Sequence, residues 1–414
     1  MTTRRPAPAG LPRLLAPRAS AVADPPIVAG PALIDEVERA GLRGRGGGGY
    51  PTALKMADVA GRRGRAVVVA NGTEGEPASR KDAVLLAHDP DLVIDGALAA
   101  AGAVGAREVI LAVSRGSPAA LDRTREAVRR RSPGASPARL SVVAPPERFV
   151  AGEESALVHW LNGGPAMPTV TPPRPSERGV DGRPTLLQNV ETLAHVALIA
   201  RHGSDWFCSV GTDADPGSML ISVSGAVRSP GVHEIALGTP IRDALALCGG
   251  PTGEVAGILA GGYFGTWLRA DDLLAVPVSA AGMRAAGGSV GAGTIVVLPR
   301  SACPLVETAR VAGYLAAESA GQCGPCVFGL RDLADAAAAL AGGRAAIDAL
   351  SALRELPGEI ERRGACAHPD GAARLVRSAL AAFPHEVSLH LQGRCTAPGA
   401  PAVLPIPRSR DGWR

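Results

Sequence analysis

Aromatic residues and long apolar runs are both scarce in this chain of 414 residues. Phe, Trp and Tyr make up only 3% of the sequence, so the hydrophobic cores must consist mainly of Ala, Leu and Val. No run of about 18 consecutive apolar residues occurs, which predicts that no helix spans a membrane. Residues 1–30 start with an Arg- and Pro-rich stretch without a compact apolar segment, so we predict a disordered tail rather than a signal peptide.

Cysteines and clustered charges are also limited. Seven cysteines are too few for a disulfide framework in a chain of this length, and they fit a reducing cytoplasm. The net charge of +4 is spread along the chain, and the densest basic run, residues 129–131, lies in a predicted helix as a solvated face. The sequence therefore predicts a cytoplasmic protein that binds no nucleic acid.

Lysine and asparagine are rare as well. Of the 43 basic residues only Lys55 and Lys81 are lysines, and the asparagines are Asn71, Asn162 and Asn189. Because this chain uses Arg wherever a general positive charge suffices, the positions that keep Lys are candidates for a specific role. Lys offers a compact point charge suited to a phosphate or a small anion, whereas Arg is a wide planar fork.

Short apolar segments alternate with helical patterns in the first half of the chain. We predict buried strands at residues 66–70, 107–113 and 139–144, and helices at 31–42, 53–60, 91–104, 118–131, 151–162 and 188–201. Strands that alternate with helices indicate a layered α/β fold with a parallel sheet. This first domain is expected to cover residues 31–210.

The pattern changes after a Gly- and Asp-rich linker at residues 211–217. Short strands and turns predict a small mixed α/β domain over residues 218–298. Residues 303–392 are rich in Ala, Leu and Arg and predict a helical domain, and residues 396–414 are expected to form a disordered tail.

A glycine-rich loop, GRGGGGYPT at residues 44–52, precedes a predicted helix that carries Lys55. Glycines let backbone N–H groups approach an anion closely, and the start of a helix adds partial positive charge. The loop lacks the ending of a Walker loop, and it does not follow a strand as a dinucleotide fingerprint does. An anion site neutralised by Lys55 and a plain flexible turn both fit this pattern.

The loop NGTEGEP at residues 71–77 directly follows a predicted strand. Ligands in α/β sheets bind at the carboxyl ends of parallel strands, so this loop is a candidate site. Glu74 and Glu76 are either ligand contacts or surface acids, and Lys81 with Asp82 can equally be an internal ion pair.

Two further polar segments are ambiguous. In GEES, residues 152–155, the two acids fit the start of a helix, where negative charge is favourable. In QNVET, residues 188–192, the polar side chains can equally cap a helix. Neither segment indicates a function by itself.

Three cysteines have the spacing of a metal or iron–sulfur site. Cys323 and Cys326 form a CxxC pair, and Cys366 follows forty residues later. Thiolates at such spacing bind zinc or iron–sulfur clusters, although a [4Fe–4S] cluster normally takes four ligands. The alternative is a set of small buried hydrophobic residues.

Taken together and in order, these segments resemble a known family. GLRGRGGGGYPTALK, NGTEGEP, GEESAL, NVETL, SGAVRSPGVHEI and ESAGQCGPC are similar to motifs of the flavin subunit of respiratory complex I. The matching subunits of NAD-reducing hydrogenases and formate dehydrogenases belong to the same family. The resemblance implies a Rossmann-like FMN-binding domain, then a ubiquitin-like SLBB domain, then a C-terminal helical-bundle iron–sulfur domain.

The resemblance also implies site residues. Two acids, Glu76 and Glu154, match positions beside the bound nicotinamide nucleotide, and Arg174 stands where the family has a stacking aromatic. Cys323, Cys326 and Cys366 match ligands of an iron–sulfur cluster. Contacts to FMN are implied for Gly44, Gly46, Gly47, Lys55, Asn71, Glu74, Gly152, Glu153, Glu154, Asn189 and Thr192.

The chain departs from the family pattern at several of these positions. Ala320 replaces the first cysteine of the cluster motif, which leaves three outcomes open: a three-iron cluster, a fourth ligand such as His368, Cys395, Cys303 or an external group, or no cluster. Thr171 and Arg174 replace the Lys and Phe of the nucleotide loop. Arg174 can stack on adenine or accept a 2′-phosphate, so NADH and NADPH both remain candidates.

The resemblance implies an NADH dehydrogenase-like flavoprotein oxidoreductase. It would pass electrons from NAD(P)H through FMN, and through an iron–sulfur cluster if one binds, to a protein carrier. The expected partner is a ferredoxin or a thioredoxin-like [2Fe–2S] subunit, which would place the protein in the cytoplasm or at the inner membrane through its partners. The alternatives are a non-catalytic scaffold and a flavin carrier that no longer uses nicotinamide.

Overall fold

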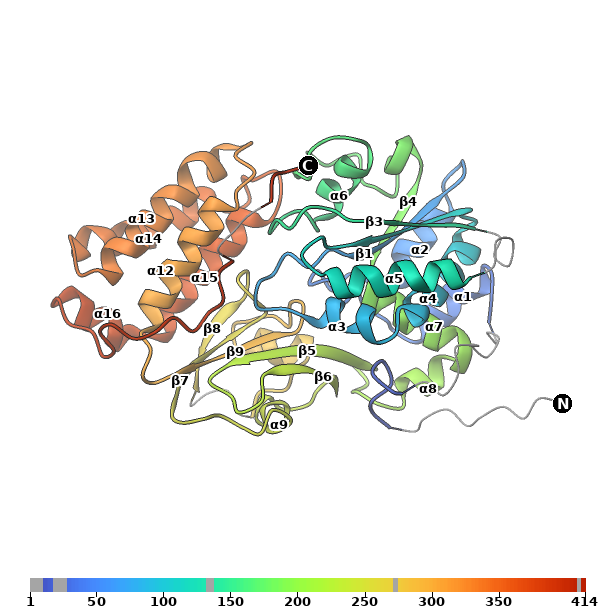
Figure 1. The fold of residues 1–414 in the computed structure, drawn as a ribbon. Coiled ribbons are helices and arrows are strands. Elements are labelled where there is room, and N and C mark those ends of the chain that lie inside the picture. Colours follow the sequence, from blue (N-terminus) through green and yellow to red (C-terminus); the bar gives the residue numbers. More distant parts are fainter. Residues whose placement is uncertain (1–9, 18–27, 132–137, 271–274, 408–410) are drawn as a thin grey trace.

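The computed structural model describes residues 10–17, 28–131, 138–270, 275–407 and 411–414. The chain forms an α/β domain, a smaller mixed domain and a helical bundle, which follow one another along the sequence (Figure 1). Within the described residues, no helix is both long enough and apolar enough to cross a membrane.

The first domain is built on a four-stranded parallel sheet, as the alternation of strands and helices predicts. The strand order is β3-β2-β1-β4. The fourth strand is not among the predicted strands, and its last two residues belong to the segment 188–201, for which the sequence predicts a helix. Pairing with β1 makes it a strand, through Val67 opposite Thr185 and Asn71 opposite Asn189. The bounds are β1 (Val67–Gly72), β2 (Glu108–Val113), β3 (Arg139–Val143) and β4 (Thr185–Asn189).

Helices cover both faces of this sheet (Figure 1). Val68 and Ala70 point into the larger core with most of the helices, while Val67 and Val69 point to the opposite face, which α6 covers. A strand that is buried on both faces reads as a continuous apolar run, as β1 does. The helices are α1 (Ala32–Arg39), α2 (Thr52–Ala60), α3 (Lys81–His88), α4 (Pro90–Val104), α5 (Pro118–Arg130), α6 (Glu154–Leu161), the short η1 (Val180–Gly182), α7 (Val190–His202) and α8 (Ser204–Cys208).

The second domain has a five-stranded mixed sheet in the order β6-β5-β9-β7-β8. Strand β5 pairs antiparallel with β6 and parallel with β9. Strand β8 forms one edge of this sheet. The bounds are β5 (Ser218–Gly225), β6 (Gly231–Ala236), α9 (Ile241–Ala246), β7 (Val255–Ala260), β8 (Thr266–Arg269), α11 (Ala280–Ala285) and β9 (Thr294–Pro299).

The helical domain packs on the second domain through one shared core, in which Trp267 of β8 lies edge-on to Phe383. Its Ala- and Leu-rich helices bury one face each, as their sequence predicts. The bounds are α12 (Pro304–Ala317), the π-helical turn η2 (Pro325–Gly329), α13 (Leu330–Ala341), α14 (Ala346–Ile360), α15 (His368–Ala382) and α16 (Pro384–Leu391).

The few aromatic residues gather where the three domains meet. Phe149 of the first domain lies edge-on to Phe264 of the second domain and to Tyr314 and His368 of the helical domain. Tyr263 also contacts Tyr314. Of the five Phe and three Tyr residues in the chain, four are therefore at this junction. These four of the twelve aromatic residues help to join the three domains.

The described parts of both chain ends are packed, which corrects the predicted disordered tails. At the N-terminal end, Leu14 is buried and its backbone N–H donates to Glu234 at 2.7 Å. At the C-terminal end, Leu404 donates to Glu307 at 2.9 Å, and the ring of Trp413 lies 3.7 Å from the Arg148 guanidinium. The C-terminal segment thus runs from the helical domain to the first domain (Figure 1). Residues 1–9, 18–27 and 408–410 of these predicted tails lie outside the described residues.

Candidate functional site

The glycine-rich loop closes on itself and is attached to α7. The Gly44 N–H donates to the Tyr50 carbonyl at 2.9 Å, and the Arg45 N–H donates to the Thr192 hydroxyl at 2.9 Å. Gly47 and Gly49 have positive φ angles of 104° and 60°, which disfavour any side chain. The loop is therefore held in one shape at the amino end of α7.

The other side of this loop is open. A Cβ atom at Gly48 or Gly49 would meet no atom within 4 Å. Among the described residues, the backbone N–H groups of Gly46 to Gly49 have no hydrogen-bond acceptor of normal geometry. Successive free N–H groups beside open space form an anion-binding surface, so the loop fits the phosphate of a flavin nucleotide.

The ends of β1 and β4 meet this loop, so that the implied flavin residues come together. The Asn71 side chain donates to the Gly152 carbonyl at 2.8 Å, and the Asn189 side chain donates to the Asn71 carbonyl at 3.3 Å. A Cβ atom at Gly46 would lie 3.3 Å from the Cβ of Asn189, and one at Gly152 would lie 2.4 Å from the Thr73 carbonyl. Four segments distant in sequence thus converge at the carboxyl end of the sheet.

Thr73 adds a second sign of a ligand here. Its hydroxyl is buried and has no hydrogen-bond partner in the described part of the chain. A buried polar atom without a partner is costly, and a bound group can supply the missing hydrogen bond. Together with the open glycine loop, this hydroxyl supports the fit of FMN to the site.

Two of the implied flavin residues also start helices, as the alternative interpretation has it. The Glu153 carboxylate accepts from the N–H groups of Ser155 at 2.9 Å and Ala156 at 3.1 Å at the start of α6. Burial raises the pKa of Glu153. Asn189 accepts from the Glu191 N–H at 3.0 Å and so caps α7. Capping holds both side chains at the edge of the site.

Lys55 points toward Glu154, with which it forms an ion pair. The Lys55 side chain is 18% exposed and that of Glu154 is 43% exposed, so both lie at the edge of the site. This contact joins α2 to the start of α6. The structure therefore places Lys55 with the implied flavin residues, with its charge balanced by one carboxylate.

Glu74 and Glu76 are half-buried, and both carboxylates accept hydrogen bonds from backbone N–H groups of the protein. Glu74 accepts from the Ala83 N–H at 3.3 Å at the start of α3. Glu76 accepts from the Tyr263 N–H at 2.7 Å and the Ala78 N–H at 3.2 Å, so it joins the first domain to the second. Burial raises the pKa of both carboxyls to about 7. Glu76 and Glu154 do not contact each other, and Glu76 lies on the wall of a cavity of about 510 Å³.

Lys81 pairs with Asp82, as one of the two alternatives has it, and both belong to a buried charge cluster beneath the site that the sequence pattern does not predict. Lys81 is 1% exposed and lies 2.6 Å from Asp82 and 2.9 Å from Glu191. Glu191 also accepts from the Leu220 N–H at 2.8 Å in β5, and the Arg45 guanidinium donates to the Ser218 carbonyl at 3.1 Å. The nearby carboxylates raise the pKa of Lys81 despite its burial. The rarity of Lys is one signal in the sequence that marks this position.

A second pocket lies beside the glycine loop. Tyr50 and Arg174 line it together with Thr171, and its volume is about 590 Å³. Arg62 and Glu177 also face this pocket and lie 3.4 Å apart. An aromatic ring and a guanidinium on one pocket suit a nucleotide base, which either group can stack on.

The three predicted cysteine ligands surround one cavity in the helical domain. Cys323, Cys326 and Cys366 line a small cavity of about 10 Å³, and Ala320 lines it as well. Burial raises the pKa of Cys326 to about 12 and that of Cys366 to about 11. Buried thiols that gather in this way are suited to a cationic group, which would stabilise the thiolates.

His368 lines the same cavity. Its Nε2 lies 2.8 Å from the Leu315 carbonyl, so Nε2 carries the proton and Nδ1 keeps a free lone pair. Nδ1 is buried and has no hydrogen-bond partner among the described residues. Burial lowers the pKa of His368 to about 4, which keeps the ring neutral. The cavity therefore offers three thiols and one imidazole nitrogen.

Matches to known families follow the three domains in order. Residues 37–198 match the Nuo51 FMN-binding domain, residues 220–262 match the SLBB domain, and residues 307–390 match the iron–sulfur binding region of NADH-ubiquinone oxidoreductase F. The implied fold and cofactor regions are thereby confirmed.

Whole-chain relatives agree. Over 374 residues the chain is 32% identical to the F subunit of the NADH-quinone oxidoreductase of Streptomyces coelicolor, in a match that covers 87% of this chain and 83% of the relative. It is 33% identical over 377 residues to the corresponding protein of Mycobacterium bovis, with 87% and 85% covered.

A solved structure shares the fold. The crystal structure of NAD⁺-reducing [NiFe]-hydrogenase in the H2-reduced state contains a chain that is 32% identical, with a TM-score of 0.80 over 87% of this chain. The protein described here spans 63% of that hydrogenase chain. With identity above 30% over most of both sequences and all three domains matched in order, the chain belongs to the family of the flavin-binding F subunits of NADH-quinone oxidoreductases.

Proposed function

We propose that this protein oxidises a nicotinamide nucleotide at an FMN site and delivers the electrons to a protein carrier. The observation that carries the proposal is the convergence of the open glycine loop with Asn71, Gly152 and Asn189 at the carboxyl end of the sheet. FMN, when bound, supplies the chemistry of accepting a hydride and releasing single electrons. The residues of this chain hold and orient the two nucleotides.

Each part of the site has a distinct task in this proposal. The N–H groups of the glycine loop bind the FMN phosphate, with Lys55 as the nearby cation. Asn71 and Asn189 fix the strand ends, while Tyr50 and Arg174 hold the adenine side of the dinucleotide in the adjacent pocket. Arg174 in place of an aromatic residue leaves both NADH and NADPH as substrates to test.

The first experiment is an absorbance spectrum of anaerobically purified protein before and after NADH and then NADPH. We expect flavin bands that bleach with one of the two nucleotides. The matched variant is Gly48→Val, because a Cβ atom there meets no atom within 4 Å, and in this proposal the added side chain takes the space of the phosphate. It should fold normally and lose flavin, whereas Gly102→Ala, which also meets no atom within 4 Å, should retain it.

The opposite result would favour a different function. Protein that stays colourless after reconstitution with FMN, iron and sulfide would contradict the oxidoreductase and support a scaffold. Ala320 in the cluster cavity is the observation that makes a scaffold the second candidate. Flavin that binds but is reduced by neither nucleotide would indicate a carrier that receives electrons from a protein.

Within this function, His368 replaces the missing cysteine as the fourth cluster ligand. Its free, buried Nδ1 in the cysteine cavity supports this assignment. We expect His368→Ala to lose iron and the electron paramagnetic resonance signal of the reduced cluster. The double variant Ala320→Cys with His368→Ala should regain both, since it restores a fourth thiolate. Full iron content in His368→Ala would contradict the assignment.

The acceptor is proposed to be a ferredoxin or a thioredoxin-like [2Fe–2S] subunit. The family relatives are subunits of NADH-quinone oxidoreductases, which supports a protein partner. Reduction of such a carrier by NADH in the presence of this protein is the direct test. Absence of transfer to either carrier, with flavin reduction intact, would contradict this choice of partner.

A further inference from the structure

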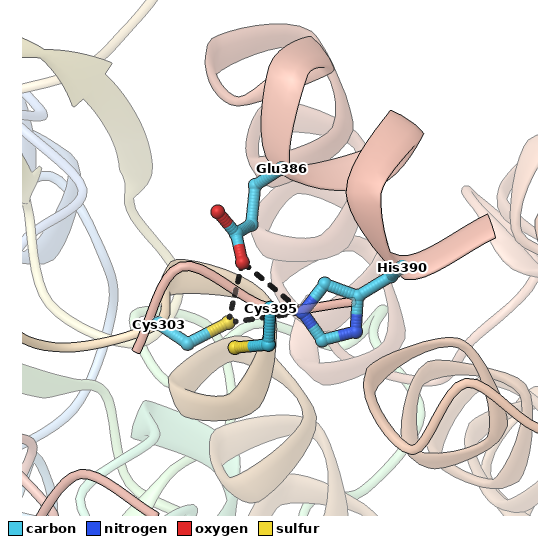
Figure 2. Close-up of side chains that lie close together, drawn as sticks. All are labelled: Cys303, Glu386, His390 and Cys395. Atoms are coloured by element: carbon cyan, nitrogen blue, oxygen red, sulfur yellow. Dashed lines mark hydrogen bonds and ion pairs between the residues drawn. The ribbon is translucent and has the colours of Figure 1, made fainter. Parts of the chain in front are cut away.

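A second group of metal-ligating side chains lies in the helical domain, and the proposed function does not use it. Cys303 precedes α12, Glu386 and His390 are on α16, and Cys395 follows α16 (Figure 2). One ligand atom from each residue lies within 4.8 Å of those of the other three. Glu386 and His390 are four residues apart, so they share one face of the helix.

Three of the distances between ligand atoms are close to those of a tetrahedral metal site. Cys303 Sγ lies 3.3 Å from His390 Nε2 and 3.5 Å from Glu386 Oε1, and the last two atoms are 3.2 Å apart. Zinc bonds of about 2.0–2.3 Å at tetrahedral angles require ligand atoms about 3.3–3.8 Å apart. The side chains thus point at a common centre before any ion binds (Figure 2).

Neighbouring groups hold the ligands in place. His390 Nδ1 lies 3.2 Å from the Leu340 carbonyl, to which it donates, and this leaves the lone pair of Nε2 free to face the cluster. The Thr396 hydroxyl donates to Glu386 Oε2 at 2.7 Å, which orients the carboxylate. Second contacts of this kind are typical of protein metal sites.

The cluster is buried and lacks a strong cation. Cys303, Glu386 and His390 are each at most 5% exposed. In the described chain no Lys or Arg pairs with Glu386, whose only ion-pair partner is His390. The Glu386 carboxylate accepts hydrogen bonds from Thr396 but has no full positive charge beside it among the described residues, and a divalent ion would supply that charge and favour thiolates over thiols.

We propose that Cys303, Glu386, His390 and Cys395 bind a structural zinc ion. Two thiolates, one imidazole and one carboxylate form a soft donor set that suits zinc and not magnesium or calcium. This site is separate from the cavity of Cys323, Cys326 and Cys366. Cys303 and Cys395 are therefore not the missing ligands of the iron–sulfur cluster.

The zinc would fasten the C-terminal segment to the bundle. Cys395 is the last ligand before the segment that reaches Leu404, whose N–H donates to Glu307, and Trp413, which stacks on Arg148. Zinc would link the start of α12 to the end of α16 and so fix where this segment leaves the bundle. It acts on the packing of the domains and takes no part in electron transfer.

The test begins with the metal content of the full-length wild-type protein. We expect about one zinc ion per chain, in addition to any cluster iron. Replacement of zinc by Co²⁺ should give the visible bands of a tetrahedral thiolate site. These measurements need no variant, so they remain informative if a variant fails to fold.

Matched cysteine variants then assign the ligands. Cys395→Ala should lose the zinc and the cobalt bands while it keeps the iron and flavin of the wild type. The control Cys208→Ala should keep the zinc, because Cys208 is exposed and lies outside the cluster. Wild-type protein that binds neither zinc nor cobalt, iron in place of zinc at these ligands, a disulfide between Cys303 and Cys395, or zinc retained by Cys395→Ala would each overturn the proposal.

Discussion

At the scale of single residues, the two lysines turn out to have different surroundings. Lys55 sits at the edge of the candidate site with an exposed partner, Glu154. Lys81 is buried between Asp82 and Glu191, so it links the start of α3 to α7. The rarity of Lys therefore marked one position at the site and one structural position beneath it. The ammonium group is compact, and Arg in this space would be too wide.

We predict that Lys81→Met lowers the free energy of unfolding by about 3–5 kcal/mol, because it leaves two buried carboxylates without their cation. Denaturant unfolding of the apoprotein measures the change. Arg80→Met is the control, since Arg80 is exposed, and it should change the stability by less than about 0.5 kcal/mol. Equal effects of the two substitutions would show that the buried cluster is not important for stability.

Glu76 gives a prediction of pH dependence. Burial raises its pKa from 4.5 to about 7, so the folded protein keeps the proton where the unfolded chain has lost it. The contribution of Glu76 to the free energy of unfolding is fully present below about pH 4.5 and is lost as the pH rises through about 7. As the pH rises between these limits, the free energy of unfolding of Glu76→Gln should increase by about 1–3 kcal/mol relative to that of the wild type.

Unfolding curves at a series of pH values check this prediction. Glu126→Gln is the control, because its side chain is 50% exposed and makes only surface ion pairs. Its difference from the wild type should stay constant with pH. A constant difference for Glu76→Gln as well would mean that Glu76 is already ionised in the acidic folded protein.

At the scale of elements, the close packing of α4 on α7 supports the sheet end that carries the site. A Cβ atom at Gly96 in α4 would lie only 1.7 Å from the Leu193 carbonyl oxygen in α7. Helix backbones can approach this closely only where a residue has no side chain. Asn189 caps the same α7 and Thr192 lies in its first turn, so a shift of this helix would move the site.

We predict that Gly96→Ala destabilises the protein by at least about 1–3 kcal/mol through overpacking, and that it weakens flavin retention. Gly102 is in the same helix but meets no atom within 4 Å. Gly102→Ala should therefore stabilise the protein by about 0.5–1 kcal/mol through its better helix propensity. Thermal unfolding of both variants, with and without FMN, compares them. Equal stability would contradict the close helix contact.

At the scale of the whole molecule, the chain ends and the aromatic junction hold three domains together. Val403 and Leu404 donate to the buried Glu307 at 3.2 Å and 2.9 Å, and the backbone of Ala166 donates to the Trp413 carbonyl at 2.7 Å. The C-terminal segment thus contacts both the helical bundle and the first domain. Its removal should loosen their association.

We predict that deletion of residues 400–414 lowers the free energy of unfolding by about 3 kcal/mol. The deletion exposes the apolar surface that Leu404 covers on the bundle, and it removes two hydrogen bonds to Glu307. Deletion of residues 411–414 alone leaves Leu404 in place and should cost less. Thermal unfolding and limited proteolysis measure the difference. If the longer deletion costs no more than the shorter one, the contacts of Leu404 with the bundle contribute little.

The sequence by itself determined the family, the order of the three domains and the loops that form the candidate flavin site. These features depend on local patterns, such as apolar runs in β1 and glycines with a required backbone shape, and they need no knowledge of distant contacts. The segments around Gly44, Asn71, Gly152 and Asn189 were all identified in this way. Cys323, Cys326 and Cys366 were likewise found from spacing and motif.

Only the tertiary structure decided the contacts between distant parts of the chain. Residues 185–189 form strand β4 because they pair with β1. By their sequence alone, the last of these residues suit the start of a helix equally well. Glu76 faces the second domain, Lys81 is enclosed by acids, and Cys303 meets Cys395 and His390 across more than eighty residues. Burial and packing fix such contacts, and sequence spacing does not encode them. The prediction of disordered tails is wrong for the described parts of both chain ends, for the same reason. Their few apolar residues, such as Leu14 and Leu404, are buried in sites that only the folded domains create.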